Sequence, residues 1–549
     1  MAMDRRWAQA PCKREELVLF SRTLDEVVPP DDPVRVLDQC LELVDWTPWE
    51  ARYASRVGQP PIHPRVVAGC IVFGMMRKIR SSRELEDATR RRVDFMWFTE
   101  GRTIDHATFA AFRTDFEGPL RDLNRQISEQ VCRRHLNTLL TMVLDGTRVR
   151  ADSDRHGSRT AGGLDKLIAA CVAQLDRKLA ALAKSDEGEA AQAQEAADKE
   201  VDELRREIAR LNKQMEDYQK ALEVAQARDA VRRAHNGKGA PPVRVPVTDP
   251  DPPISPNKEG GFAPNYTPVV GVDPVSRAII YQDVLEGSDE NAAVLVAVEA
   301  VEEMSGKPLE QILADGNFAS GPNLEALELR GTTPYMPTGT QHNDGNPANR
   351  PDPTVPVPPE DWERLPRYGK YLDGTAFIYD ACRDRYYCPM GQPLKPGRHG
   401  KTPGGVSYTN YTCAGKAGCP LAGRCVKGKA SHRTVRRDQY QYMREHVGRR
   451  MSTEEGKAVY AQRAPVVEGV FAEIKHLMGI RRFLLRGLDK VRTEWTWICT
   501  AFNLKRLMAL LSKAPPQACG PQSALPATHK AHDIASKARL WAQSAPCAA

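Results

Sequence analysis

The stretch from residue 460 to residue 475 reads Y-A-Q-R-A-P-V-V-E-G-V-F-A-E-I-K and predicts an amphipathic helix whose polar face can carry a functional site. Pro465 suits the first turn, where the N–H that proline lacks has no partner within the helix. Glu468 and Lys475 are seven residues apart, which is about two helical turns, so both lie on the polar face. One apolar arc of the helix is formed by Val466, Val467, Val470, Phe471, Ile474 and Leu477.

Two short apolar runs upstream of this helix end in the same way, with an aspartate followed by a glycine. The run T-M-V-L-D-G-T places Asp145 at the end of a predicted strand, and the run Q-I-L-A-D-G-N does the same for Asp315. A single aspartate at a strand end is usually structural or caps a helix. Two in matching contexts, together with Glu468, predict a site for two divalent metal ions. Hard cations take oxygen ligands, and a metal pair can clamp the attacking and leaving oxygens of a phosphodiester.

Other acidic residues compete for the three ligand positions. Glu473 lies about 140° from Glu468 around the helix, at the edge of the apolar arc, and can be a salt-bridge partner or the ligand itself. We prefer Glu468 because Lys475, on the same face, can hold a phosphate beside the metal. The alternatives to the two aspartates are Asp152, Asp154, Asp283 and Asp289.

Composition limits the class of protein. A chain of 549 residues with 41% hydrophobic residues predicts a globular protein of roughly two to four domains. Its longest apolar run, residues 66–76, is interrupted by glycines and is shorter than the ~18 to 20 residues that span a bilayer. The N-terminus, M-A-M-D-R-R-W, lacks the apolar core of a signal peptide. We therefore expect a cytoplasmic bacterial protein without a membrane partner.

The net charge is +7, and Lys and Arg outnumber Asp and Glu between residues 426 and 513. Clusters such as Arg481 and Arg482 can supply the salt-dependent phosphate contacts that dominate affinity for DNA. A solvated basic surface is the alternative explanation of the same pattern.

The order of the predicted elements indicates an α/β core with insertions. Residues 33–134 show helical periodicity, and residues 433–511 return to it after short predicted strands between 377 and 425. A sustained heptad pattern predicts an antiparallel helical hairpin that breaks at residues 185–188, with a dimerisation arm as the alternative. The heptad is formed by Val201, Leu204, Ile208, Leu211, Met215, Tyr218 and Leu222.

The cysteines indicate a second kind of metal chemistry. In a cytosolic chain, thirteen cysteines are free thiols or metal ligands rather than disulfides. Four thiolates can close a tetrahedral zinc site, although the spacing here is looser than that of a C-x-x-C pair. The alternative is a set of free thiols in a small β module. The candidate ligands are Cys388, Cys413, Cys419 and Cys425, with Cys382 and His432 as spare candidates.

These motifs resemble those of the DDE transposases of bacterial insertion sequences, in the group marked by a Tyr-Arg-Glu-Lys signature. Tyr460, Arg463, Glu468 and Lys475 match that signature, with one extra residue between the arginine and the glutamate. The stretch G-I-R-R-F-L-L-R-G-L-D-K-V-R-T-E-W, residues 479–495, and the N-terminal H-P-R-V-V-A-G-C-I-V-F-G also resemble that group. The resemblance covers roughly residues 30–150 and 245–510.

The resemblance implies a ribonuclease-H-like catalytic core in which Asp145, Asp315 and Glu468 hold two Mg²⁺ or Mn²⁺ ions. It also implies a helical N-terminal domain that binds terminal inverted repeats, and an activity of metal-dependent DNA cleavage and strand transfer. The partners are then double-stranded DNA of the repeats and of the target. We expect a homodimer on DNA, associated with the nucleoid. We expect the DNA to be bound by Tyr460, Arg463, Lys475, Arg481 and Arg482.

Two features depart from the family pattern. The heptad segment is longer than the core needs, and the T-D-P-D element at residues 248–251 is followed by a divergent P-P-I-S-P. The alternative function is therefore a catalytically inactive, transposase-derived DNA-binding protein. A host nuclease with the same core would cleave DNA without needing the terminal repeat. The expected division of the chain is an N-terminal arm (1–32), a helical DNA-binding domain (33–134), the first part of the core (135–163), a helical-hairpin or coiled-coil insertion (164–235), the second part of the core (236–337), a β-rich insertion with the cysteines (338–432), a C-terminal helical part of the core (433–513) and a disordered tail (514–549).

Overall fold

The computed structural model describes residues 23–53, 61–134, 139–186, 194–236, 239–257, 260–287, 289–339, 345–402, 404–414, 417–428 and 430–512. The chain divides into two compact units: unit 1 comprises residues 1–127 and 500–517, and unit 2 comprises residues 128–499 and 518–549. The boundaries fall inside two long helices, α8 (Glu117–Arg134) and α17 (Leu488–Leu511). The expected disordered tail and the first 22 residues of the expected arm lie outside the described residues.

Unit 1 is helical throughout its described residues, as its periodicity predicts. Ser81 caps α5 in a capping box, in which its side chain accepts from the Glu84 N–H while the Glu84 side chain accepts from the Ser81 N–H. Asp105 caps α7 by accepting from two backbone N–H groups. Besides parts of α8 and α17, the unit contains α1 (Leu24–Val27), α2 (Pro33–Glu42), α3 (Thr47–Glu50), α4 (Pro64–Met76), α5 (Ser82–Arg91), α6 (Val93–Phe98) and α7 (His106–Asp115).

The core of unit 1 is rich in aromatic side chains. Trp49 and Phe112 stack with their ring centroids 5.3 Å apart. Phe98 in α6 covers Gly69 in α4 so closely that a Cβ on Gly69 would lie 2.2 Å from the phenyl ring. The glycine therefore sets the distance between these two helices.

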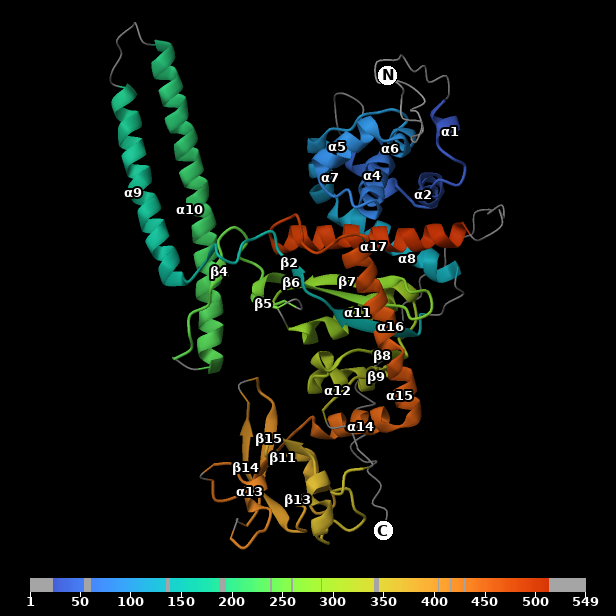
Figure 1. Ribbon diagram of the computed structural model, residues 1–549, viewed down its shortest axis with the longest axis vertical. Helices are drawn as coiled ribbons and strands as arrows, with labels where there is room; N and C mark the ends of the chain where they lie inside the picture. Colours follow the sequence, from blue (N-terminus) through green and yellow to red (C-terminus); the bar gives the residue numbers. More distant parts are fainter. Residues whose placement is uncertain are drawn as a thin grey trace, which may run out of the picture. The chain divides into compact units, whose positions relative to one another are not determined.

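Unit 2 contains the central sheet (Figure 1). Among the described strands, hydrogen-bonded neighbours follow the order β2-β6-β1-β8-β9, and β5 and β7 also pair with β6. Strand β1 is antiparallel to β6 and parallel to β8, which is in turn parallel to β9. The strands are β1 (Thr141–Gly146), β2 (Val149–Arg150), β5 (Ile254–Pro256), β6 (Phe262–Val272), β7 (Ile279–Leu285), β8 (Gln311–Leu313) and β9 (Thr333–Tyr335).

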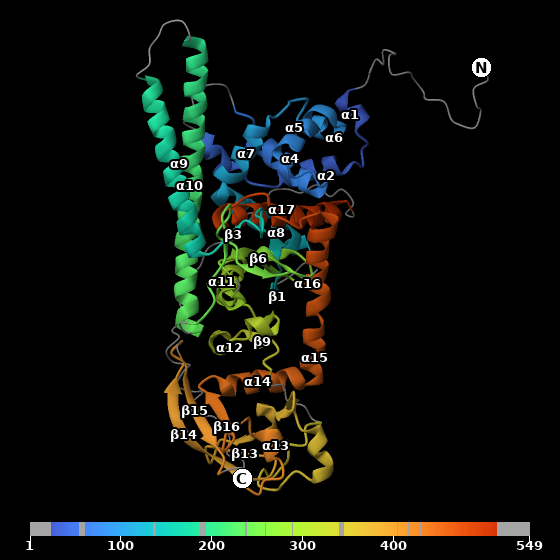
Figure 2. The same ribbon diagram turned by 60° about the vertical axis from the view of Figure 1, so that its left-hand side comes forward.

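The middle of this sheet is buried between helices. Every residue from position 264 to position 272 of β6 is buried, which is typical of a strand covered on both faces. Helix α16 (Arg463–Ala472) contacts β1, and α11 (Ala293–Ser305) contacts β7. The two helices lie on either side of the sheet in Figure 2. A hairpin turn at Asp273 joins β6 to β7, and the Asp273 carboxylate accepts hydrogen bonds of 2.6 Å from the N–H and the hydroxyl of Ser276.

The T-D-P-D element fixes the start of α17 in unit 2. Tyr266 in β6 donates its hydroxyl to Asp249 at 2.9 Å, and the Gly487 N–H donates to the same carboxylate at 3.2 Å. Asp251 accepts from the Leu488 N–H at 2.8 Å. Burial raises the pKa of Asp249, while the hydrogen bond from Tyr266 acts in the opposite direction. Both aspartates of this element therefore act as structural hydrogen-bond acceptors.

Two long helices, α9 (Ala161–Asp186) and α10 (Gln194–Asn236), pack along each other in the segment with the heptad pattern (Figure 1). Leu211 is buried at their contact, and its carbonyl oxygen accepts a hydrogen bond from the Cys171 thiol. The predicted break begins where α9 ends, and residues 187–193 lie outside the described residues. Within the described part of the chain, no helix is both long enough and apolar enough to cross a membrane.

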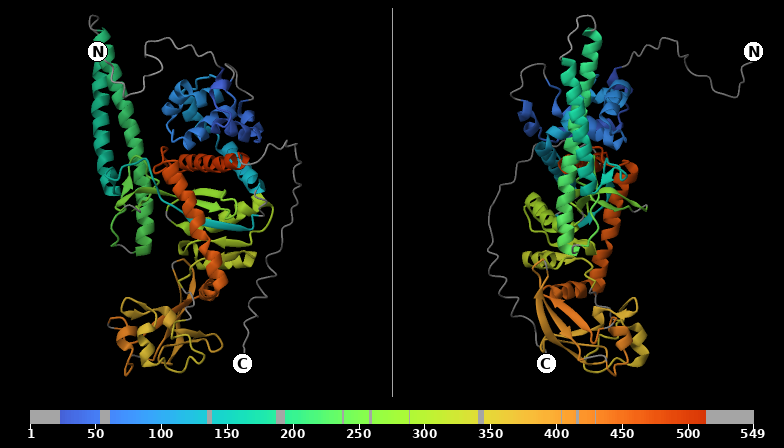
Figure 3. Two further views of the ribbon diagram at one scale, coloured as in Figure 1. Left: turned by 45° about the vertical axis from the view of Figure 1, so that its right-hand side comes forward. Right: turned by 90° about the vertical axis from the view of Figure 1, so that its left-hand side faces the viewer.

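The segment with the clustered cysteines forms its own small sheet (Figure 3). Its described strands pair in chain order, from β12 to β16, and all neighbours are antiparallel. The strands are β12 (Ile378–Asp380), β13 (Arg385–Tyr387), β14 (Pro393–Lys401), β15 (Ser407–Thr412) and β16 (Thr434–Asp438), with the separate pair β10 (Arg367–Tyr368) and β11 (Tyr371–Leu372).

The sheet of the insertion extends further than the sequence predicts. Residues after Arg433 were expected to be helical, but residues 434–438 form β16 and pair with β15. Val435 in the middle of β16 is buried while its neighbour Arg436 is exposed, which is the alternation of a half-buried strand rather than of a helix. Helix begins only at Gln441, in α14 (Gln441–Ser452), and continues in α15 (Glu454–Ala461).

Candidate active site

The parallel pairing of β1 with β8 brings Asp145 and Asp315 to the same edge of the sheet. Val143 pairs with Leu313, and each aspartate follows its paired residue by two positions. Asp145 accepts from the Gly146 N–H at 2.9 Å, and Asp315 caps a short 3-10 turn by accepting from the Asn317 N–H at 2.8 Å. The structure thus brings together the two aspartates that the sequence singles out.

A guanidinium group lies between these two carboxylates. Nη2 of Arg463, at the start of α16, is 2.8 Å from Asp145 Oδ1 and 3.9 Å from Asp315 Oδ2. Both partners of the shorter ion pair are largely shielded, with 15% and 16% of their side chains exposed. Tyr460 joins the group: burial raises the pKa of its hydroxyl, and the nearby charge and hydrogen bond of Arg463 lower it.

A further carboxylate, which sequence reasoning missed, lies at the same edge. Glu290 is on a short 3-10 turn between β7 and α11, and a Cβ on Gly146 would lie 2.5 Å from its Oε1. Burial raises the pKa of Glu290, and the charge of Asp315 raises it further. No local sequence signal marks Glu290, because its place depends on the pairing of β6 with both β7 and β1. Its neighbour Asp289, which the sequence offered instead, accepts from the Asn291 N–H at 3.1 Å.

The third predicted ligand is not brought to the aspartates. Glu468 is exposed on α16, and Glu473 is half-buried at the start of a π-helical turn, Glu473–Leu477. Across the described residues, no group of three or more His, Cys, Asp or Glu side chains is arranged to hold a metal ion. The choice between the two glutamates therefore stays a prediction.

The predicted DNA-binding residues are distributed around the end of β1. Lys475 Nζ donates to Thr147 Oγ1 at 2.5 Å and to the Arg148 carbonyl at 2.9 Å, so this lysine is anchored two residues beyond Asp145. Arg481 Nη2 lies 3.1 Å from Nδ1 of His476.

The competing aspartates have other partners. Asp152 forms ion pairs with Arg482 and Arg486, and Arg482 still has 59% of its side chain exposed. Asp283 pairs with Arg492 at 3.1 Å. These ion pairs account for both carboxylates as structural groups, which leaves Asp145 and Asp315 as the better candidates.

Two family models match the chain. One, described as a transposase DDE domain, matches residues 387–508, and the other, a transposase domain (DUF772), matches residues 22–115. Together, the two matches support a DDE transposase of the insertion-sequence type. No curated protein and no solved structure matches it.

The DDE match contains only part of the candidate site. The DDE match contains the segment with Tyr460, Arg463 and Glu468, whereas Asp145 and Asp315 precede it. The link between the two parts is therefore the geometry described above, in which Arg463 contacts both aspartates.

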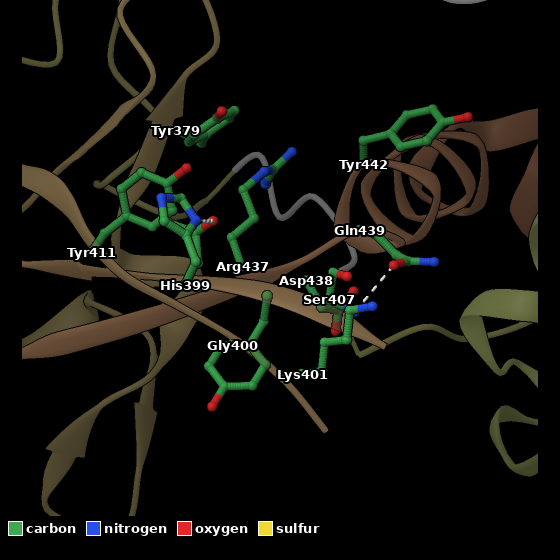
Figure 4. A pocket seen from close by; sticks show the side chains of 12 residues that line it. Tyr379, His399, Gly400, Lys401, Ser407, Tyr411, Arg437, Asp438, Gln439 and Tyr442 are labelled. Carbon is green, nitrogen blue, oxygen red and sulfur yellow. Dashed lines mark hydrogen bonds between the residues drawn. The ribbon is translucent and has the colours of Figure 1, made fainter. Parts of the chain in front are cut away.

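The same match includes the second half of the β-rich insertion, and the insertion has a pocket of about 640 Å³. Tyr379 and Tyr411 lie on one side of the pocket and Tyr442, from α14, on the other (Figure 4). Arg437 is fixed over the Tyr379 ring, 3.8 Å from its centroid, and pairs with Glu445 through two contacts of 2.6 and 3.1 Å. An exposed lysine, Lys401, also lines the pocket.

The insertion also gathers the predicted zinc ligands. Cys388, Cys413, Cys419 and Cys425, here called the cysteine cluster, are partly buried against one apolar core. The spare candidates differ, because Cys382 is exposed in the turn between β12 and β13, and His432 is exposed and contacts Ser431.

Proposed function

We propose that this transposase binds the terminal inverted repeats of an insertion sequence and catalyses metal-dependent cleavage and strand transfer of DNA. The observation that carries the proposal is the meeting of Asp145 and Asp315 around Arg463, a residue of the matched DDE segment. The strand order β7-β6-β1-β8-β9, with an antiparallel hairpin followed by parallel strands, supports a ribonuclease-H-like core.

The donor set fits hard divalent cations. This fit is one of chemistry: carboxylate oxygens are the donors that such cations take, and Asp145 and Asp315 place two of them around Arg463, with Glu290 close to Gly146 at the same edge. When bound, Mg²⁺ or Mn²⁺ ions would activate the attacking oxygen and neutralise charge at the phosphodiester. We propose Asp145, Asp315 and Glu468 as the residues that hold them.

The signature residues would exchange partners when DNA arrives. In the DNA-free chain, Arg463 is engaged by Asp145 and Asp315. A phosphate at the transposon end is a competing partner for the guanidinium, which binds phosphate and carboxylate through the same fork of donors. Departure of Arg463 would leave the two aspartates open to cations, and Glu468, two turns before the anchored Lys475, would complete the set from α16.

Other surfaces would hold the rest of the DNA. Unit 1, which contains the whole DUF772 match, is the candidate reader of the inverted repeat. Arg481 and Arg482 extend the basic surface beyond Lys475. The pocket of the insertion combines tyrosine rings with Lys401, the combination that binds nucleic-acid bases and phosphates together. Processing of two transposon ends needs two such sites, so we also propose a homodimer on DNA.

The experiment is a cleavage assay with DNA taken from the flanks of the gene. We expect the wild-type chain to nick this DNA at a fixed end position in Mg²⁺, to join that end to a target, and to leave a scrambled repeat intact. Cleavage of the scrambled DNA at the same rate would indicate a host nuclease instead. Specific binding of the flank DNA without cleavage in Mg²⁺ or Mn²⁺ would indicate a catalytically inactive derivative.

A further inference from the structure

We propose that the β-rich insertion holds a structural zinc ion, bound by the four thiolates of the cysteine cluster: Cys388, Cys413, Cys419 and Cys425. The proposal goes beyond the transposase reaction and does not depend on it. Zinc content can be measured without DNA, so failure of the two proposals can be told apart.

Convergence of the four residues is the first observation. They come from four separate places: the end of β13, the end of β15, the following loop and the end of the short helix α13 (Ala422–Cys425). All four nevertheless pack against the same core, and all four are free thiols.

A backbone donor directed at sulfur is the second, independent observation. The Arg433 N–H donates to Cys413 Sγ at 3.3 Å. A buried neutral cysteine packs as a small apolar residue and needs no such donors. Donors of this kind stabilise a thiolate and orient it, which is what the surroundings of a metal ligand provide.

The turn that carries Cys388 is held rigidly in this geometry. Gly391 has φ +70°, and its N–H donates to the Cys388 carbonyl at 2.9 Å. A Cβ at this position would lie 2.0 Å from the Thr354 carbonyl oxygen, so glycine is required for space as well as for conformation. Arg350 Nη2 donates to the same Cys388 carbonyl at 2.8 Å. The C-P-M-G turn is thus preorganised to present sulfur.

A fixed cation lies beside the cluster. Four thiolates carry more charge than Zn²⁺ neutralises, so a structural site of this type benefits from a neighbouring positive group. The Arg433 guanidinium donates to the carbonyls of Cys425 and Leu372 at 3.3 and 3.2 Å and lies 5.3 Å from the centroid of the Phe377 ring. Its charge also acts on the Cys425 thiol.

Binding would draw the thiols inward. The described side chains do not already form a set in ligand geometry, so the ion would close the site by rotation of the cysteine side chains. Such closure would join β13, β15 and α13 around a small core, in which metal binding adds directly to the free energy of folding.

The test uses the purified full-length wild-type chain. We expect stoichiometric zinc by elemental analysis, and cobalt substitution should give the thiolate charge-transfer and d–d absorption of a tetrahedral site. With metal bound, alkylation followed by mass spectrometry should spare the four clustered thiols and modify Cys382. After a chelator removes the metal, the alkylating reagent should modify the four clustered thiols as well as Cys382.

Variants supply the matched control. Cys382→Ser, which removes the exposed cysteine of the same insertion, should keep the zinc, whereas Cys413→Ser and Cys419→Ser should lose it. The proposal is overturned if the wild-type chain holds no zinc after reconstitution. It is also overturned if zinc is bound while the clustered thiols react as fast as Cys382.

Discussion

The carboxylate edge of the central sheet and the cysteine cluster of the insertion are both candidate metal sites, but they are built in opposite ways. At the carboxylate edge, Asp145 and Asp315 share an arginine, and the third predicted ligand, Glu468, remains exposed. In the insertion, the four cysteines already lie against one core, and Cys413 accepts a hydrogen bond from a backbone N–H. The difference is that between an open site, which must admit a substrate, and a closed one, which only holds the fold.

The largest effect is expected at the open site. Asp145→Ala or Asp315→Ala should reduce cleavage of the terminal repeat by ~10³-fold or more, the scale on which one essential catalytic group acts, because each removes a carboxylate needed for the metal ions. Binding of the repeat, measured by gel shift, should be unchanged. Asp154→Ala, a nearby exposed aspartate, is the matched control and should cleave normally. Cleavage by Asp315→Ala at the control rate would remove this edge from the chemistry.

Loss of zinc from the cysteine cluster should lower the stability of the insertion rather than the rate of DNA cleavage. Loss of zinc through Cys413→Ser should remove a sizeable part of the ~10 kcal/mol that a structural zinc contributes to small domains. Limited proteolysis should then cut within residues 345–438 while unit 1 stays resistant. Equal protease resistance of this variant and Cys382→Ser would contradict the proposed difference between the two sites.

A substitution of Arg463 tests the carboxylate edge by removing its cation. Arg463→Gln removes the cation that holds Asp145 and Asp315, so Mn²⁺ should bind the DNA-free chain about tenfold more tightly, consistent with ~1.4 kcal/mol for a charge-assisted contact. The measurement is free Mn²⁺ by electron paramagnetic resonance, on chains already loaded with zinc. Repeat cleavage should fall at the same time. Unchanged Mn²⁺ affinity would show that the guanidinium does not compete with cations.

The smallest effect is expected at the pocket of the insertion. Lys401→Ala removes one exposed charge, so DNA binding should weaken by about 1 kcal/mol and the slope of log K against log salt should fall by about one unit. Lys457→Ala, which removes an exposed lysine paired with Glu454, is the control. Equal salt slopes for both variants would take the pocket out of the DNA interface.

Local pattern predicted much of this molecule. An apolar run ending in Asp-Gly located both aspartates, and a heptad pattern located α9 and α10, because each signal lies within one segment. The insertion was harder. Its last strand, β16, contains Arg436 and Arg437, so its sequence is polar and does not predict a strand. The strand forms through its pairing with β15.

What the sequence could not show is which side chains from different elements meet. Glu290 reaches Gly146 because β7 ends at the same edge as β1, and nothing near Glu290 in the chain announces that position. The contact of Arg463 with both aspartates has the same origin. In the pocket, His399 and Thr409 lie opposite each other only through the register of β14 and β15. Helical periodicity alone likewise leaves Glu468 and Glu473 as alternatives.

The most direct test of the proposed active site is repeat cleavage in Mg²⁺ by Glu468→Ala beside Glu473→Ala, with binding measured on the same DNA. Our account predicts that Glu468→Ala binds the repeat but no longer cleaves it, while Glu473→Ala cleaves close to the wild-type rate. Wild-type cleavage by Glu468→Ala, together with loss of cleavage in Glu473→Ala, would contradict the assignment and place the third carboxylate at the π-helical turn.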